Sequence, residues 1–101
     1  MAVFNPLKTI AQERVTVNDT VGGVRLTRTN FIDPPLGLTA LITVETASIR
    51  YLTDGTAPTS TTGILAYPGA KIELHNPGEL DAFRAIRTGS ASGTLQVEYF
   101  G

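Results

Sequence analysis

The sequence predicts an all-β fold, an antiparallel β-sandwich of about eight strands, and two features of the chain support this. Polar and apolar residues alternate along several short segments, which is typical of antiparallel strands that turn one face to a core. Segments rich in Gly, Pro, Asn and Asp separate these runs at short spacing, as they do in sandwiches and barrels. The length of 101 residues is that of a single domain.

The alternation assigns a face to each residue of the expected strands. In residues 70–75, for example, Ile72 and Leu74 point to one face and Glu73 to the other. The expected strands are residues 14–18, 24–28, 40–45, 48–53, 70–75 and 94–100, and the expected turns are residues 18–23, 33–37, 54–63, 67–70, 75–79 and 88–93.

Two further segments leave their conformation open. Near the N-terminus, Asn5 and Pro6 are compatible with the start of a short helix or with an extended arm. We expect the arm, which divides the chain into an N-terminal arm, residues 1–12, and a β-sandwich domain, residues 13–101. Residues 79–88 fit one or two helical turns and equally a strand, because their apolar residues satisfy both spacings.

The composition excludes several classes of partner and chemistry. The net charge is -1 and the 8 Lys and Arg residues are scattered, so we expect no nucleic acid partner. Cysteine is missing, which excludes disulfides and thiolate chemistry and suits a reducing cytoplasm. No apolar run is long enough to span a bilayer, and the N-terminal stretch lacks the pattern of a signal peptide.

The residues that carry catalytic or metal chemistry are few and dispersed. The single histidine, His75, ends an expected strand and has no nucleophile motif to accompany it. The carboxylates occur singly and form no calcium-loop pattern. We therefore expect no enzyme activity, no metal and no cofactor.

The turn segment at residues 54–63 predicts a structural corner. Asp54 has the side chain to accept a backbone N–H two residues along, as in an Asx turn. Gly55 supplies a φ that other residues resist, and Pro58 stiffens the chain. We expect these three residues to form a structural turn and not a ligand site.

The second half of the chain resembles a known pattern. The segments "IRYLTDGTAPTSTTGILAYPGAKIEL" and "FRAIRTGSASGTLQVEYF" are similar to a recurring pattern in small structural proteins of tailed bacteriophages. The match covers residues 49–100, about half of the chain, and residues 1–48 share only the strand-rich character.

This resemblance implies a fold and a role. It implies a jelly-roll or related β-sandwich and the function of a decoration (cement) protein on a phage head. Such a protein binds the major capsid protein, bridges neighbouring subunits and opposes the pressure of packaged DNA. It also implies a small homo-oligomer, with a trimer favoured over a dimer, located on the capsid surface of the virion after synthesis in the host cytoplasm.

A second resemblance implies a different role. Residues 49–59, "IRYLTDGTAPT", are also similar to a signature of the immunoglobulin-like domain appended to chitobiases and other carbohydrate enzymes, although the residues that follow depart from it. The alternative function is a tail- or fibre-associated or carbohydrate-binding β-sandwich module. A glycan site of this kind needs exposed aromatic residues, and the chain has 3 Tyr, 4 Phe and no Trp.

Apolar residues outside the expected core are the candidates for contact with the capsid or with other copies. The arm supplies four of them and the loop before the central strand supplies two. They are Val3, Phe4, Leu7, Ile10, Phe31 and Leu36.

Overall fold

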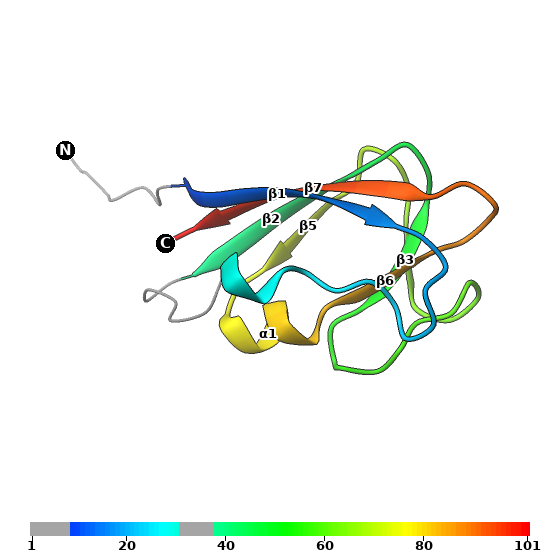
Figure 1. The fold of residues 1–101 in the computed structure, drawn as a ribbon, viewed down its shortest axis with the longest axis horizontal. Helices are drawn as coiled ribbons and strands as arrows, with labels where there is room; N and C mark the ends of the chain where they lie inside the picture. The colour runs from blue at the N-terminus through cyan, green and yellow to red at the C-terminus, as the bar shows by residue number, and fades with distance from the viewer. Residues whose placement is uncertain (1–8, 31–37) are drawn as a thin grey trace.

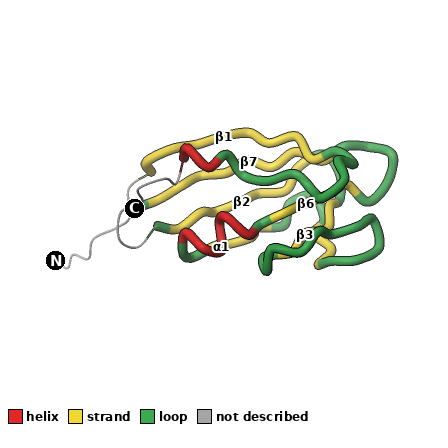
Figure 2. The backbone as a smooth tube through the Cα atoms, turned by 60° about the horizontal axis from the view of Figure 1, so that its bottom comes forward, coloured by secondary structure: helices red, strands yellow, loops and turns green. Residues whose placement is uncertain are grey.

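The structure is a computed structural model that describes residues 9–30 and 38–101. Two antiparallel sheets pack face to face, as Figures 1 and 2 show. The larger sheet has the strand order β1-β7-β2-β5, and the smaller sheet has the order β4-β3-β6. The predicted all-β sandwich is confirmed.

The described residues form seven strands, one short α-helix and one 3-10 turn. The strands are β1 (Thr9–Val17), β2 (Thr39–Glu45), β3 (Ile49–Leu52), β4 (Ile64–Ala66), β5 (Lys71–Leu74), β6 (Arg84–Arg87) and β7 (Gly93–Phe100), with α1 at Pro77–Ala82 and the 3-10 turn at Arg28–Asn30. None of the helical segments in these ranges is long and apolar enough to cross a membrane.

The strand pairs are nested, as they are when one long antiparallel hairpin winds over two sheets. The first strand, β1, pairs with the last, β7, and an isolated bridge joins Val24 to Ala85 of β6. Further in, β2 pairs with β5, and β3 pairs with β4. This nested winding over two sheets is that of a jelly roll, with the loop between β3 and β4 at the tip of the hairpin.

The predicted strand at residues 24–28 is reduced to that one bridge. Its neighbours on both sides take its polar groups instead: the Thr27 N–H donates to Glu13 of β1, and Arg25 binds Asp81 of α1. Leu26 is buried in the core. The segment is therefore tied to β1 and α1 by side-chain acceptors and does not form a strand ladder.

The first strand begins earlier than the sequence indicated. Residues 9–12, which the sequence placed in the arm, belong to β1 and pair with β7, with a register shift between Thr9 and Ala11. The reason is that the inward alternation of Val17 and Val15 continues through Glu13 to Ala11. Residues 1–8 lie outside the described part of the chain.

Residues 79–88 satisfy both of the conformations that the sequence left open. They begin in α1, whose N-cap Asn76 accepts a hydrogen bond from the Glu79 N–H at 2.8 Å. Pro77 occupies the first turn, where its missing N–H has no cost. The helix ends at Phe83, and β6 follows directly.

The core lies between the two sheets. It contains inward residues that the alternation predicted, together with Leu38, Leu80 and Phe83, which lie outside the predicted strands. The ring of Phe83 stacks on Tyr51 with 5.7 Å between the ring centroids. The largest fully buried side chains are Tyr99, Phe83, Leu38, Ile42, Ile49, Leu74, Leu80, Leu95, Val17, Val44 and Val97.

Candidate functional site

The loop at residues 53–63, between β3 and β4, is closed by its own polar groups. The carboxylate of Asp54 accepts the Thr56 N–H at 3.0 Å and the Thr56 hydroxyl at 2.6 Å, which forms an Asx turn. Gly55 lies between them at φ +88°, which L side chains rarely adopt. The bond from the Thr56 hydroxyl lowers the pKa of Asp54, so the carboxylate remains charged and keeps its role as acceptor.

Arg50 of β3 fastens this loop to the body of the protein. Its Nε donates to the carbonyl of Ser60, and its Nη1 donates to the carbonyl of Gly63, both at 3.0 Å. Pro58 is buried, and a Cβ on Gly63 would lie 3.3 Å from the Pro58 side chain and 3.2 Å from the Tyr51 carbonyl. The loop therefore packs tightly against the strand that it leaves.

A cleft of about 380 Å³ lies where this loop meets two other turns. The turn at residues 18–23, the end of β6 and the connection from β6 to β7 supply its other walls. Its apolar lining comes mainly from Val21, Ala57, Pro58 and Ile86. This cleft lies at the end of the sandwich that carries the hairpin tip.

The rim of this cleft carries one ion pair and one exposed apolar side chain. Arg87 donates to the Asp19 carboxylate at 3.2 Å. Val21 is 97% exposed, in a turn closed by a hydrogen bond from the Gly23 N–H to the Thr20 carbonyl at 2.9 Å. The two charges of the rim therefore neutralise each other, and the exposed side chain of Val21 is apolar.

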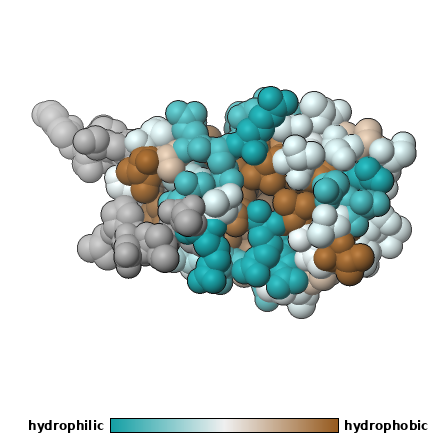
Figure 3. All heavy atoms as spheres, viewed as in Figure 1, coloured by the Kyte–Doolittle hydropathy of each residue, from teal (hydrophilic) through white to brown (hydrophobic). Residues whose placement is uncertain are grey.

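A second, smaller groove of about 300 Å³ lies on the outer face of the larger sheet. Leu41 of β2 and Phe100 of β7 line it, together with Thr39 and Glu73. Ile10 lies next to the Phe100 end of this sheet, at the register shift of β1, and is 46% exposed. Figure 3 shows hydrophobic atoms at the surface near this end of the molecule.

Glu13 is a half-buried carboxylate on the inner side of β1, surrounded by donors. It accepts the Thr27 N–H at 3.1 Å, the Thr27 hydroxyl at 2.7 Å and the Asn30 amide at 3.1 Å, and also the Tyr99 hydroxyl. Burial raises the pKa of Glu13, but the hydrogen bonds together outweigh it and leave the pKa below its ordinary value. Burial and the contact with Glu13 raise the pKa of Tyr99, which therefore stays a protonated donor.

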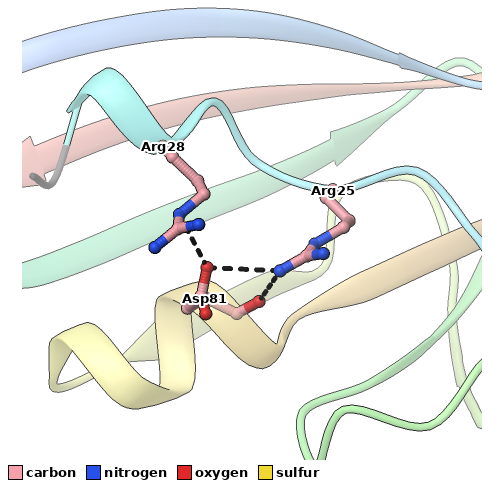
Figure 4. Close-up of polar contacts among 3 residues, drawn as sticks. All are labelled: Arg25, Arg28 and Asp81. Carbon is pink, nitrogen blue, oxygen red and sulfur yellow. Dashed lines mark hydrogen bonds and ion pairs between the residues drawn. The ribbon is translucent and has the colours of Figure 1, made fainter.

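On the opposite side of the same segment, two arginines share one carboxylate, as Figure 4 shows. Arg25 Nη2 and Arg28 Nε approach the same Asp81 oxygen at 3.2 and 3.1 Å. Arg25 also donates to the Asp81 carbonyl at 2.8 Å. Residues 24–30 therefore form a strap that is held on one side by Glu13 and on the other by α1.

His75 lies at the surface, where its ring nitrogen is 3.6 Å from the Glu73 carboxylate. Its backbone N–H donates to the Glu79 side chain at 2.7 Å, so the residue supports the start of α1. Within residues 9–30 and 38–101, no group of three or more His, Asp or Glu side chains is close enough to hold a metal ion.

The structure places only some of the contact candidates from the sequence. Ile10 lies in β1, as described above. The other five lie outside the described residues: Val3, Phe4, Leu7, Phe31 and Leu36. The turn residues Asp54, Gly55 and Pro58 all lie in the loop that borders the cleft.

Sequence reasoning missed two residues that organise these surfaces. Arg50 alternates as an outward strand residue, and no local pattern shows that a loop ten residues later folds back onto it. Glu13 was open to detection, because it shares the inward phase of Val15 and Val17. A charged residue in that phase requires buried donors.

The tyrosines do not gather into a platform for sugar rings. Tyr51 stacks on Phe83, and Tyr99 is buried in the core. Tyr67 is 63% exposed in the turn between β4 and β5.

Comparison with known proteins finds no relative for this chain: no family model, no curated protein and no solved structure matches it.

Proposed function

We propose that this chain is a structural protein of a bacteriophage virion that decorates the capsid and bridges neighbouring major capsid subunits. The observation that carries the proposal is the nested pairing of β1 with β7 and β2 with β5, the jelly-roll winding that recurs in viral capsid domains. The resemblance of residues 49–100 to small phage structural proteins supports the same role. The chain acts on the virion surface, as a small homo-oligomer, without nucleic acid or membrane as a partner.

The outer groove of the larger sheet is the surface proposed to meet the capsid. Leu41 and Phe100 line it, and Ile10 is exposed beside it. Burying one such side chain at an interface contributes about 1.5–3 kcal/mol. A few contacts of this size suffice, because each copy that bridges two subunits is held at both ends.

The role is mechanical and needs no catalysis or cofactor. The carboxylates of Glu13 and Asp54 accept hydrogen bonds from other groups of the chain itself. The bonds to Glu13 tie the strap to β1, those to Asp54 close the turn at the hairpin tip, and Arg50 ties that tip to the body. Such contacts make a stiff module, which suits a protein that transmits load between subunits.

Occupancy of capsids tests this proposal. Capsids of the phage that encodes the chain, prepared without it, are mixed with the purified protein and sedimented. We expect the wild type to saturate the capsids. We expect I10E to reduce the bound copies at least about tenfold, since a charge would be buried where an apolar side chain was.

Tyr67→Glu serves as the matched control, because Tyr67 is exposed but lies outside the outer groove. It should bind like the wild type. Full occupancy by I10E would exclude Ile10 and the adjoining Phe100 end of the sheet from the contact. Failure of the wild type to bind any capsid of that phage would exclude the proposed function.

A further inference from the structure

The cleft beside the hairpin tip carries both parts of a self-complementary contact. Its volume is about 380 Å³, whereas a cavity of about 150 Å³ already holds benzene. An aliphatic side chain therefore fits against its lining of Ala57, Pro58 and Ile86. Val21, at the rim of the same cleft, is an aliphatic side chain that is 97% exposed.

The cleft is preformed, so a ligand does not have to order it. Pro58 is buried, and its side chain would lie 3.2 Å from a Cβ on Gly23 and 3.3 Å from one on Gly63. The bonds from Arg50 to the Ser60 and Gly63 carbonyls hold the loop wall in place. Binding to such a site loses little conformational entropy.

The charges on the rim are also self-complementary. Asp19 and Arg87 pair within one copy at 3.2 Å, and the Asp19 side chain is 70% exposed. When two such rims face each other about a two-fold axis, each Asp19 can meet the Arg87 of the other copy. A contact of this kind pairs opposite charges across the interface.

We propose that two copies of the chain associate through this cleft about a two-fold axis, with Val21 of each copy inserted into the cleft of the other. A two-fold contact uses the same patch on both copies, so the inserted side chain and the cleft that receives it have to lie side by side. In a ring of three copies, the inserted side chain and the receiving cleft have to lie on two different faces of each copy. The inference thus deepens the homo-oligomer of the proposed function and selects a dimer where the sequence resemblance favoured a trimer.

The contact is modest in size. Stable interfaces bury about 1,200–2,000 Å² in total, and here only three short turns and one strand meet. We expect dissociation in the micromolar to millimolar range. Attachment of both copies to one capsid would strengthen such a pair, since the second contact becomes intramolecular.

Self-association of the purified chain tests the inference without any capsid. Sedimentation equilibrium from micromolar to millimolar concentration should show a monomer–dimer equilibrium for the wild type. V21D should weaken it at least about tenfold, because a carboxylate would enter an apolar cleft. A57R, which fills the cleft from its exposed wall, should have the same effect.

Tyr67→Asp is the control with the same new charge on an exposed residue that does not line the cleft. It should dimerise like the wild type. Amide chemical shifts of the wild type should change with dilution at residues 19–22, 57, 59–60 and 86–89. These shifts also report whether V21D and A57R keep the native fold.

Three outcomes would overturn the inference: a wild type that stays monomeric at millimolar concentration, a trimer, or a natively folded V21D that dimerises like the wild type. The result is separable from the proposed function. A dimer formed through Val21 by a chain that binds no capsid refutes the decoration role alone. Capsid binding by a chain that stays monomeric refutes the dimer, and with it the homo-oligomer, but leaves the decoration role.

Discussion

At the scale of single residues, the inward carboxylate of Glu13 accepts hydrogen bonds from a segment that forms no strand ladder. The Thr27 N–H, the Thr27 hydroxyl, the Asn30 amide and the Tyr99 hydroxyl all donate to it. These donors come from the strap and from β7, so one side chain joins two parts of the fold. Because the hydrogen bonds favour the charged form, the pKa of Glu13 lies below its ordinary value of 4.5.

This lowered pKa predicts a pH dependence of folding that belongs to Glu13. The folded chain binds the proton less tightly than the unfolded chain, so the charged group contributes stability above pH 4.5. That contribution is lost as the pH falls through the lower pKa of the folded state. In E13Q the contribution is missing at every pH. The free energy of unfolding of the wild type should therefore exceed that of E13Q at neutral pH by about 1–3 kcal/mol.

Urea unfolding of both proteins from pH 7 to pH 3 measures this difference, which should shrink toward zero in acid. E73Q is the control, because Glu73 is exposed and its removal should change stability by less than about 0.5 kcal/mol. A difference between wild type and E13Q that stays constant down to the lowest pH would contradict the assignment.

At the scale of elements, the hairpin tip is held by a guanidinium, a buried proline and a glycine with no room for a side chain. Gly63 has φ +125°, and an added Cβ would meet the Tyr51 carbonyl, the Arg50 side chain and Pro58 at 3.2–3.3 Å. The backbone conformation and the close neighbours exclude other residues for independent reasons. The loop is thus an ordered wall of the cleft.

Gly63→Ala should accordingly destabilise the fold by about 1–3 kcal/mol, through strain in the backbone and crowding against Pro58. Thermal or urea unfolding measures the loss. Gly89→Ala is the matched substitution, because a Cβ at Gly89 meets nothing within 4 Å and its φ is not in the left-handed region. It should be neutral or slightly stabilising. Equal effects of the two substitutions would show that the loop yields to the new side chain.

At the scale of the whole molecule, the nested pairing joins residues that are far apart in the sequence. The partners Val15 and Leu95 lie at opposite ends of the chain, whereas Arg50 and Leu65 flank the hairpin tip. Closing the outer pairs costs more conformational entropy than closing the inner ones, because a longer loop of chain has to be closed. This makes the fold one of high contact order.

The topology predicts slow, cooperative folding. Refolding from urea should follow a single exponential in the range of milliseconds to seconds, as in other β-sandwiches, and not in microseconds. Stopped-flow measurement with tyrosine fluorescence and far-ultraviolet circular dichroism checks this, and both probes should give one rate. A microsecond phase that recovers the full amplitude would contradict it.

Much of the fold was accessible from the sequence, because local physical chemistry decides it. The alternation of Ile72 and Leu74 with Glu73, and of Leu95 and Val97 with Gln96, identified strands and their inward faces. These assignments hold because a strand with one face on a core has only one phase that buries its apolar residues.

The predictions differed from the structure where distant groups compete for the backbone. Residues 24–28 alternate like a strand, but the Glu13 carboxylate takes the backbone N–H of Thr27, and only the bridge from Val24 to Ala85 remains. The side chain of Arg25 ties the same segment to Asp81 of α1. The sequence predicted an arm that included residues 9–12, whereas in the structure these residues belong to β1 and pair with β7. The local pattern does not encode the first outcome; for residues 9–12 the alternation continues to Ala11 but does not identify β7 as the partner.

The sequence by itself determined a β body with stiff, proline- and glycine-rich turns, since period-two burial and turn chemistry act over a few residues. Only the tertiary structure decided which strands are neighbours, and hence that Val21, Pro58 and Ile86 surround one cleft. Val21 and Pro58 lie in two different turns and Ile86 lies in β6, and these segments meet only when the two sheets have formed. The physical reason is that a surface assembled from distant segments depends on the pairing of strands, and the alternation within each strand does not specify its partner.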